Sequence, residues 1–312
     1  MAHSHLEKYV YIASAGHSGS TLLNLLLNLY PEVTTVGRVQ SLKAYAKYPH
    51  RLCMCGRHVQ ECDFWRRVQA QLRQVQGNER LELADFPLMV ARKTGKWTRL
   101  VPRAADPLLL LGSRRLWRGL SRFVPDVRAM RQAALNSLAV YEAVAKVNDT
   151  PIVVDASNNA ARMKATYLTD AERFWLIHLV RDGRAVAHSQ MQRDGISMRR
   201  AALIWAQKNR NLQYMAMTIP RRRIHIVRYE DLCAYVAETM AALCAFLEIP
   251  SSVSQFIVEK QDVHNISGNP MRFRKDEREI RLDDRWRAEL TPDDLREFDR
   301  AAGRMNHRFG YV

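Results

Sequence analysis

Short apolar runs alternate along the chain with segments in which apolar residues recur at helical spacing. The runs are rich in Val, Ile and aromatic residues, which is typical of buried strands. On this basis we predict strands at residues 8–14, 151–157, 173–180 and 223–229. A helical pattern follows each run, and we predict helices at residues 20–30, 159–170, 183–194, 201–217 and 234–249.

This alternation predicts an α/β fold with a parallel sheet flanked by helices on both faces. In such sheets ligands bind beyond the carboxyl ends of the strands. The segments that follow the four runs are SAGHSGST, DASNNA, RDGRAVAHS and YEDL. We therefore expect these four segments to build one site.

The pattern changes between about residues 63 and 131, where the sequence becomes helical and strongly basic. We interpret this segment as a helical insertion in a single domain that covers residues 1–312, because no repeat or low-complexity linker divides the chain. Its tryptophans and arginines can contact an acceptor or, peripherally, an acidic membrane surface. A solvated helical face packed on its apolar side is the commoner arrangement.

Composition limits the classes of protein that fit. The chain has 312 residues, of which 47% are hydrophobic, enough for a sizeable core. No apolar run approaches the roughly 18 residues of a membrane span, so we expect a soluble, unprocessed, cytoplasmic protein. The formal net charge is +16, and ten of the 48 basic residues are lysines. Such an arginine excess suits anionic ligands, although an arginine-rich proteome would produce it as well.

Five cysteines are too few and too unevenly spaced for a disulfide scaffold, which fits a reducing compartment. Three of them form a group with a histidine in CMCGRHVQEC: Cys53, Cys55, His58 and Cys62. These side chains are competent zinc ligands, but their spacing is not that of a standard zinc finger. A structural zinc site and a loop of reduced thiols both stay open, and the spacing favours the thiols.

The loop after the first run, SAGHSGST, resembles a P-loop without its lysine. Aligned on Gly19 and Thr21, the chain has Ser14 in place of the first glycine of G-x-x-x-x-G-K-[ST] and Ser20 in place of the lysine. This weakens an ATPase or kinase interpretation. What remains is a set of backbone N–H groups and hydroxyls, including that of Ser18, at a helix N-terminus, where phosphate binds without a metal.

This loop resembles the 5′-phosphosulfate loop of sulfotransferases that use 3′-phosphoadenosine 5′-phosphosulfate (PAPS), in particular the bacterial and carbohydrate-type branch. A second segment, RDGRAVAHS, resembles the 3′-phosphate motif of that family, with Arg181 at a strand end and Ser189 on the next helix. An arginine and a hydroxyl suit a phosphate on the ribose. The resemblance implies a P-loop-like fold, PAPS as sulfuryl donor, no metal requirement, and cofactor contacts from the loop residues Gly16, His17, Ser18, Gly19, Ser20 and Thr21.

Two weaker matches follow in the C-terminal half. The segment RIHIVRYEDL resembles the strand of the family that ends in Tyr-Glu-Asp, which makes Tyr229 a candidate to lie near the adenine. Residues of about 260–290, including GNPMRF, resemble a loop that closes over the cofactor in bacterial members. The resemblance implies that Arg272 and Arg274 reach its phosphates, while a solvated loop is the alternative.

The family chemistry requires a cation at the leaving oxygen and a base for the acceptor proton. His17 stands where relatives commonly have lysine or arginine, and either its charged or its neutral ring can donate there. Relatives with Val-Gly-Glu use that glutamate as base, but this chain has Arg38, and Asn158 replaces a second lysine. We take Asp155 as the candidate base, with His17 and then His264 behind it, although Asp155 can instead cap a helix.

The leading hypothesis is a PAPS-dependent sulfotransferase acting on a hydroxyl of a glycan, glycolipid or small metabolite, which can be anionic. A sulfotransferase-like protein that binds PAPS or 3′,5′-bisphosphate without turnover is the alternative, motivated by Arg38 and Asn158. A metal-free nucleotide kinase is a third hypothesis, which the absence of the P-loop lysine from this chain disfavours. Nucleic acid is not an expected partner, since no basic and aromatic strand signature for base stacking is present.

Overall fold

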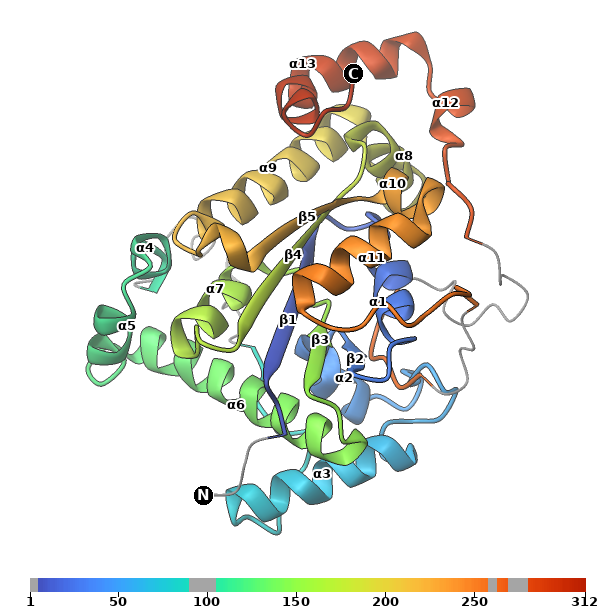
Figure 1. Cartoon of the computed structure of the whole chain (residues 1–312). Coiled ribbons are helices and arrows are strands. Elements are labelled where there is room, and N and C mark those ends of the chain that lie inside the picture. The colour runs from blue at the N-terminus through green and yellow to red at the C-terminus, as the bar shows by residue number, and fades with distance from the viewer. Residues whose placement is uncertain (1–4, 90–104, 258–262, 269–279) are drawn as a thin grey trace.

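A five-stranded parallel sheet forms the centre of the fold in a computed structural model, which describes residues 5–89, 105–257, 263–268 and 280–312 (Figure 1). The strand order is β2-β3-β1-β4-β5, and every neighbouring pair is parallel. The bounds of the strands are β1 Lys8–Ser14, β2 Val33–Gly37, β3 Ile152–Asp155, β4 Phe174–Val180 and β5 Ile224–Arg228. The predicted α/β class with a parallel sheet is confirmed.

Helices follow the strands and fill the insertion. The first half of the chain has α1 Ser20–Leu27, η1 Val39–Ser41, α2 Leu42–Lys47, α3 Asp63–Gln76, α4 Ala105–Leu111, α5 Arg114–Leu120 and α6 Pro125–Asn148. The second half has α7 Ala160–Thr169, α8 Gly183–Asp194, α9 Met198–Ala216, η3 Arg221–Arg223, α10 Tyr229–Ala234, α11 Val236–Leu247, α12 Trp286–Glu289 and α13 Pro292–Arg308. The described part of the basic insertion contains α3, α4, α5 and the start of α6, as the helical pattern predicts, and α6 continues to Asn148.

The sequence prediction misses one strand and misplaces the end of another. β2, with the sequence VTTVG, is a short edge strand with two threonines, so its apolar signal is weak. β5 ends at Arg228, and Tyr229 begins α10 instead of closing the strand. Both differences lie where five or six residues carry too little periodicity to fix an element boundary.

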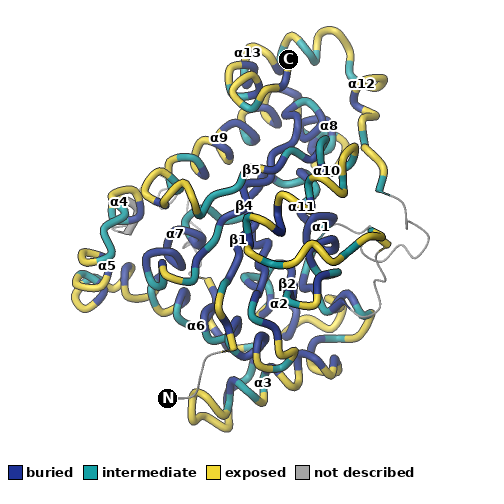
Figure 2. The backbone as a smooth tube through the Cα atoms, viewed as in Figure 1, coloured by how far each residue is buried: buried dark blue, intermediate teal, exposed yellow. Residues whose placement is uncertain are grey.

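Side chains alternate between two cores on the two faces of the sheet. On β1, Tyr9, Tyr11 and Ala13 join the core that α3, α6 and α7 cover, while Val10 and Ile12 join the core that α1, α10 and α11 cover. Figure 2 shows these strands buried in the middle and the outer faces of the helices exposed. A third, smaller core joins α8, α9 and α13. The sheet is therefore covered on both faces, which parallel strands require.

The connections reverse direction between β1 and β3, which lie side by side. β1 leads to β2, beyond β3, whereas β3 leads to β4, on the far side of β1 (Figure 1). Such a reversal opens a crevice at the carboxyl ends of the two strands, and ligands bind there in open α/β sheets. The loop after β1 and the loop after β3 therefore face each other across this crevice.

One tryptophan of the insertion, Trp117, serves packing. Trp117 on α5 is fully buried, and its indole Nε1 donates a hydrogen bond to Thr169 Oγ1 of α7 at 3.1 Å. At Trp117, therefore, the insertion packs against the domain with its apolar side and does not present this tryptophan to an acceptor or a membrane. Among the helices that the structure describes, none is long and apolar enough to span a bilayer.

A charged pair lies in the core beneath the crevice. Arg162 of α7 donates from Nη1 to Asp155 Oδ2 at 2.6 Å, and from Nη2 to Ser137 Oγ at 2.8 Å. The hydroxyl of Tyr141 donates to the same carboxylate oxygen of Asp155. Both charged residues are buried, so each carries the desolvation cost that the other offsets. This network joins β3 to α6 and α7.

We expect Arg162→Met to lower the free energy of unfolding by about 3–5 kcal/mol, because it leaves the buried carboxylate of Asp155 without its charged partner. Urea denaturation measures the change. The matched control is Arg114→Met, which removes the partner of exposed Glu172, and such surface pairs contribute about 1 kcal/mol or less. Equal losses for the two variants would show that the buried pair is not a structural anchor.

Candidate active site

The central element of the site is the loop of residues 15–19, between β1 and α1. His17 and Gly19 both adopt left-handed conformations, with φ of 63° and 87°. Gly19 directly precedes α1, and no side chain caps this helix among the described residues. The first N–H groups of α1 are therefore directed at the loop, where the helix dipole favours an anion.

Gly19 is required by a close contact as well as by its backbone angle. A Cβ atom at this position would lie 2.3 Å from Cδ2 of Tyr229. Tyr229, at the start of α10, is buried and supports the loop from the side of β5. This contact brings together two of the segments that the sequence analysis assigns to one site.

Arg181, the first residue after β4, joins these segments. Its Nη1 donates to the carbonyl oxygen of His17 at 2.9 Å, and its guanidinium carbon lies 4.5 Å from the centre of the Tyr229 ring. Its Nη2 also lies 3.3 Å from Asp283 Oδ2, in the segment before α12. The Nε atom is buried and has no partner among the described residues. The guanidinium thus keeps one N–H for a ligand while it fixes the loop.

Three of the four predicted hydroxyl residues lie in the same loop or at the start of α1. The Oγ of Ser18 is buried and has no hydrogen-bond partner in the described part of the chain, and such an atom in an anion-binding loop suits a ligand oxygen. Ser20 and Thr21 open α1. Ser189 lies two turns into α8, and its hydroxyl donates to the carbonyl of Ala185 at 3.0 Å, so its oxygen can still accept.

The ring of His17 is uncharged near neutral pH. Burial, and then the positive charge of Arg193, lower the pKa of His17 to about 4. Lys208 and Arg181 add to the effect, and Asp194 opposes it. Of the two forms that the sequence analysis considers, the environment favours the neutral ring, which can accept a proton and cannot supply a positive charge.

Lys208 is a site residue that the sequence analysis misses. It lies on α9, and its Nζ is 3.8 Å from the position that a Cβ atom of Gly16 would occupy. Although the residue as a whole is exposed, desolvation of the ammonium group, with the positive charges of Arg38 and Arg193, lowers its pKa. No motif marks this lysine, because only the packing of α9 brings it to the loop.

Asn158 closes the crevice between β1 and β3. Its Oδ1 accepts a hydrogen bond from Ser14 Oγ at 2.9 Å, which links the last residue of β1 to the loop after β3. Its Nδ2 is buried and has no partner among the residues described. The position where relatives carry a lysine therefore holds a neutral donor.

The structure argues against Asp155 as the base. Its carboxylate is 1% exposed. Oδ2 accepts hydrogen bonds from Arg162 and Tyr141, and Oδ1 is buried with no partner among the described residues, so neither oxygen is open to an acceptor. It does not cap the following helix either, because the side chain of Asn159 does so. The sequence predicts that Asp155 lies at a strand end. It does not predict its partners, because they come from two helices, α6 and α7, that pack over the strand.

Three further candidates lie away from the loop or outside the description. His264 lies among Cys53, Cys55 and Cys62, and His58 does not. The third candidate base is thus placed with the cysteine group. Arg272 and Arg274, the predicted cofactor-closing arginines, fall outside the described residues.

Comparison with known proteins agrees with this geometry. Residues 127–253 match a family described as the sulfotransferase family, and the match includes Arg181, Ser189 and Tyr229 but not the loop of residues 15–19. Among curated proteins, none matches the chain by sequence.

Two solved structures share the fold over the whole chain. One is the sulfotransferase domain from the curacin biosynthetic pathway, with 16% identity, a TM-score of 0.54, and 98% of this chain and 99% of that one covered. The other is the sulfotransferase domain from the Synechococcus PCC 7002 olefin synthase, with 18% identity, a TM-score of 0.53, and coverage of 100% and 98%. Residues 127–253 are thus similar to the sulfotransferase family, and the chain shares the fold of these two sulfotransferase domains.

Proposed function

We propose that this protein transfers a sulfuryl group from PAPS to an acceptor hydroxyl. The observation that carries the proposal is the cradle formed by the loop of residues 15–19 and Arg181. Two buried donors of this cradle, Ser18 Oγ and Arg181 Nε, have no partner among the described residues. Donors of this kind at a helix N-terminus suit a phosphate or phosphosulfate group. The kinase alternative lacks support, since Ser20 replaces the lysine that reaches terminal phosphates.

We propose the following arrangement for the donor. The N–H groups and hydroxyls of the loop would hold the 5′-phosphosulfate, and Arg181 with Ser189 would hold the 3′-phosphate. Tyr229 shapes the loop through Gly19, and its place beside the adenine stays a prediction. When bound, PAPS supplies an activated sulfuryl group whose transfer needs positioning and charge stabilisation.

Three side chains of this protein supply the remaining roles. Lys208 Nζ places a positive charge beside the loop, where the family commonly has a basic residue at the position of His17. The neutral ring of His17 can accept the acceptor proton at a ring nitrogen. The Nδ2 of Asn158 is directed to no protein acceptor in the described region and can donate to a sulfuryl oxygen. In this scheme the base stands at the position where relatives commonly have the cation, and the cation comes from α9 instead.

A groove along the outer side of α9 supports an acceptor with negative charge. Lys208 lines this groove and also borders the loop, so the groove and the loop share this residue. Both basic and apolar side chains line it, among them Arg199, Arg200, Leu203, Ile204 and Arg210. We propose that the acceptor is an anionic hydroxyl compound with an apolar part, such as a charged glycolipid or a similar metabolite.

A binding protein without turnover is the second candidate. It is favoured by Arg38 and Asn158, which replace the glutamate and the lysine of relatives. Binding of 3′,5′-bisphosphate supports both candidates, and transfer of labelled sulfate to any acceptor separates them. All five cysteines are free, in keeping with a reducing compartment, and a cytoplasmic location stays a prediction.

We expect 3′,5′-bisphosphate to raise the melting temperature of the wild type and to have little effect on Arg181→Ala. At a hundred times its dissociation constant, a ligand of the folded state adds about 2.7 kcal/mol of stability. Differential scanning fluorimetry measures the shift, with Arg115→Ala, an exposed arginine of α5, as the matched control. If ATP with magnesium stabilises the wild type equally well, the PAPS assignment fails.

We expect Lys208→Gln to lower the rate of sulfate transfer by roughly 10²-fold, as does the loss of one stabilising donor in other enzymes. The affinity for 3′,5′-bisphosphate should change little, because the loop and Arg181 remain. A radiolabel transfer assay and calorimetry measure the two quantities. Lys146→Gln, an exposed lysine on α6, is the control, and a variant at Lys208 with unchanged transfer would remove this residue from the mechanism.

We expect two histidine resonances with titration midpoints near pH 4, from His17 and from buried His178, whose pKa burial lowers to about 4. Proton NMR of the wild type and of His17→Gln measures them, and one should disappear in the variant. Because the unfolded chain takes up these protons first, stability falls as the pH drops from about 6.5 to about 4. A midpoint for His17 near 6.5 would restore the charged ring as a candidate cation.

A further inference from the structure

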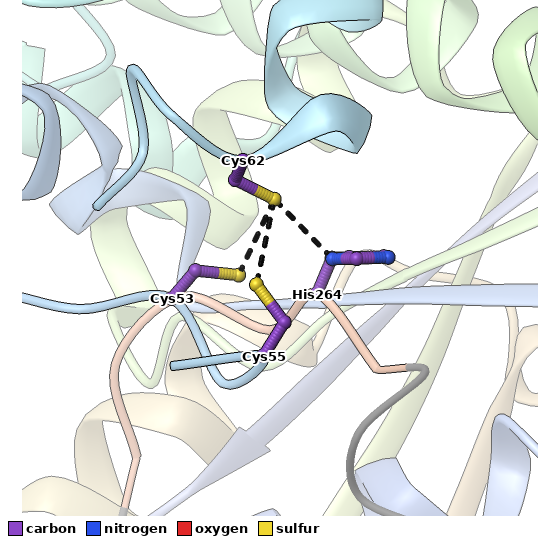
Figure 3. A group of neighbouring side chains, drawn as sticks. All are labelled: Cys53, Cys55, Cys62 and His264. Atoms are coloured by element: carbon purple, nitrogen blue, oxygen red, sulfur yellow. Dashed lines mark hydrogen bonds between the residues drawn. The ribbon is translucent and has the colours of Figure 1, made fainter. Parts of the chain in front are cut away.

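Four side chains with metal-binding atoms converge beside the sheet edge at β2 (Figure 3). Cys53 and Cys55 lie on the loop after α2, Cys62 directly precedes α3, and His264 lies in the segment 263–268. Cys53 and Cys62 are fully buried, and Cys55 and His264 are half-buried. All four ligand atoms lie within 4.8 Å of one another.

The distances within this cysteine–histidine cluster match those around a single ion. Cys62 Sγ lies 3.6 Å from Cys55 Sγ, 3.9 Å from Cys53 Sγ and 3.3 Å from His264 Nδ1. A tetrahedral zinc ion with bonds of about 2.3 Å to sulfur and about 2.0 Å to nitrogen places two sulfurs about 3.8 Å apart and a sulfur and a nitrogen about 3.6 Å apart. The cysteines are free, so no disulfide accounts for the convergence.

The surrounding structure holds His264 in place. Its ring stacks on Phe64 with 4.9 Å between centroids and an angle of 7°, and its carbonyl accepts from Trp65 Nε1 at 3.0 Å. The next residue, Asn265, accepts at its carbonyl from the N–H of Met54 at 3.1 Å. Contacts of this kind fix the orientation of a ligating imidazole before the metal arrives.

The loop of the cysteines is fixed by its own backbone. The N–H of Cys53 donates to the carbonyl of Arg57 at 2.9 Å, and the N–H of Gly56 donates to the carbonyl of Cys53 at 2.9 Å. The N–H of Cys62 donates to the carbonyl of His58, also at 2.9 Å. The loop therefore presents its thiols in one direction, and His58 contributes its backbone to this arrangement.

We propose that Cys53, Cys55, Cys62 and His264 bind one zinc ion as a structural site. Three thiolates and one imidazole in a tetrahedron are a ligand set that zinc favours, and binding releases the thiol protons to solvent. Four protein ligands leave no open position, so the ion binds no substrate or water. None of the four ligands has a role in the proposed sulfuryl transfer, so the zinc proposal does not rest on that function.

The zinc ion would join two parts of the chain that are 202 residues apart. On one side of His264 the backbone continues to Ile266, which pairs with β2: its N–H donates to Val36 O at 3.0 Å, and its carbonyl accepts from the N–H of Arg38 at 2.7 Å. The metal would therefore hold the segment 263–268 against the strand whose end carries Arg38. Loss of the zinc ion should therefore loosen the edge of the candidate active site next to Arg38.

Metal analysis of the full, untagged chain, purified under reducing conditions, tests the proposal directly. We expect about one zinc ion per chain by inductively coupled plasma mass spectrometry, as a closed four-ligand site requires. Cobalt exchanged into the protein should give the intense visible bands of a tetrahedral thiolate site. If the fully reduced wild type binds neither ion after reconstitution, the proposal is wrong.

Variants identify the ligands. Cys62→Ser and His264→Gln should lose the zinc, while the matched controls Cys244→Ser and His58→Gln should keep it. Loss of zinc in His58→Gln with retention in His264→Gln would replace the proposed ligand set by the one suggested by sequence spacing.

A second measurement on the wild type covers variants that fail to fold. A mercurial reagent that reacts with thiols should release the zinc to a chromogenic chelator as the cluster cysteines react, and peptide mapping identifies which ones do. Release coupled to Cys53, Cys55 and Cys62 supports the site. Release coupled to other cysteines contradicts it.

Discussion

A single buried guanidinium determines how the segments of the site meet. Arg181 hydrogen-bonds to the carbonyl of His17, lies on the ring of Tyr229 and pairs with Asp283, so the ends of β1, β4 and β5 and the segment before α12 all touch one side chain. A buried arginine is costly unless its donors are satisfied. The loops around it are therefore held close together, and the donor that the protein leaves unused points to a ligand.

The electrostatics of the site follow from where its positive charges originate. None of them belongs to the loop of residues 15–19. Lys208, Arg38 and Arg193 come from α9, from the end of β2 and from α8, and each disfavours a further proton nearby. Burial lowers the pKa values of His17 and Lys208 most, and this crowding of positive charge lowers both further. An anion in the loop would relieve it, which couples binding to protonation.

Local signals predict most of the fold and about half of the site. The strands around Val10 and Ile177 are recognisable because buried parallel strands are continuous apolar runs, and Gly19 and Arg181 stand in motifs with fixed spacing to those strands. Lys208 and His264 could not be predicted in their roles. Each reaches its place through the packing of elements distant in sequence, which no spacing along the chain encodes.

The pairing of Ile266 with β2 has a consequence for the behaviour of the protein in solution. β2 is an edge strand, and an edge with unpaired N–H and carbonyl groups can recruit a strand from another molecule. Ile266 hydrogen-bonds to the carbonyl oxygen of Val36 and to the N–H of Arg38. This pairing requires a glycine at position 37, because a Cβ atom there would lie 2.4 Å from the carbonyl oxygen of Ile266. A stretch of chain next to the site thus also guards this end of the sheet against aggregation.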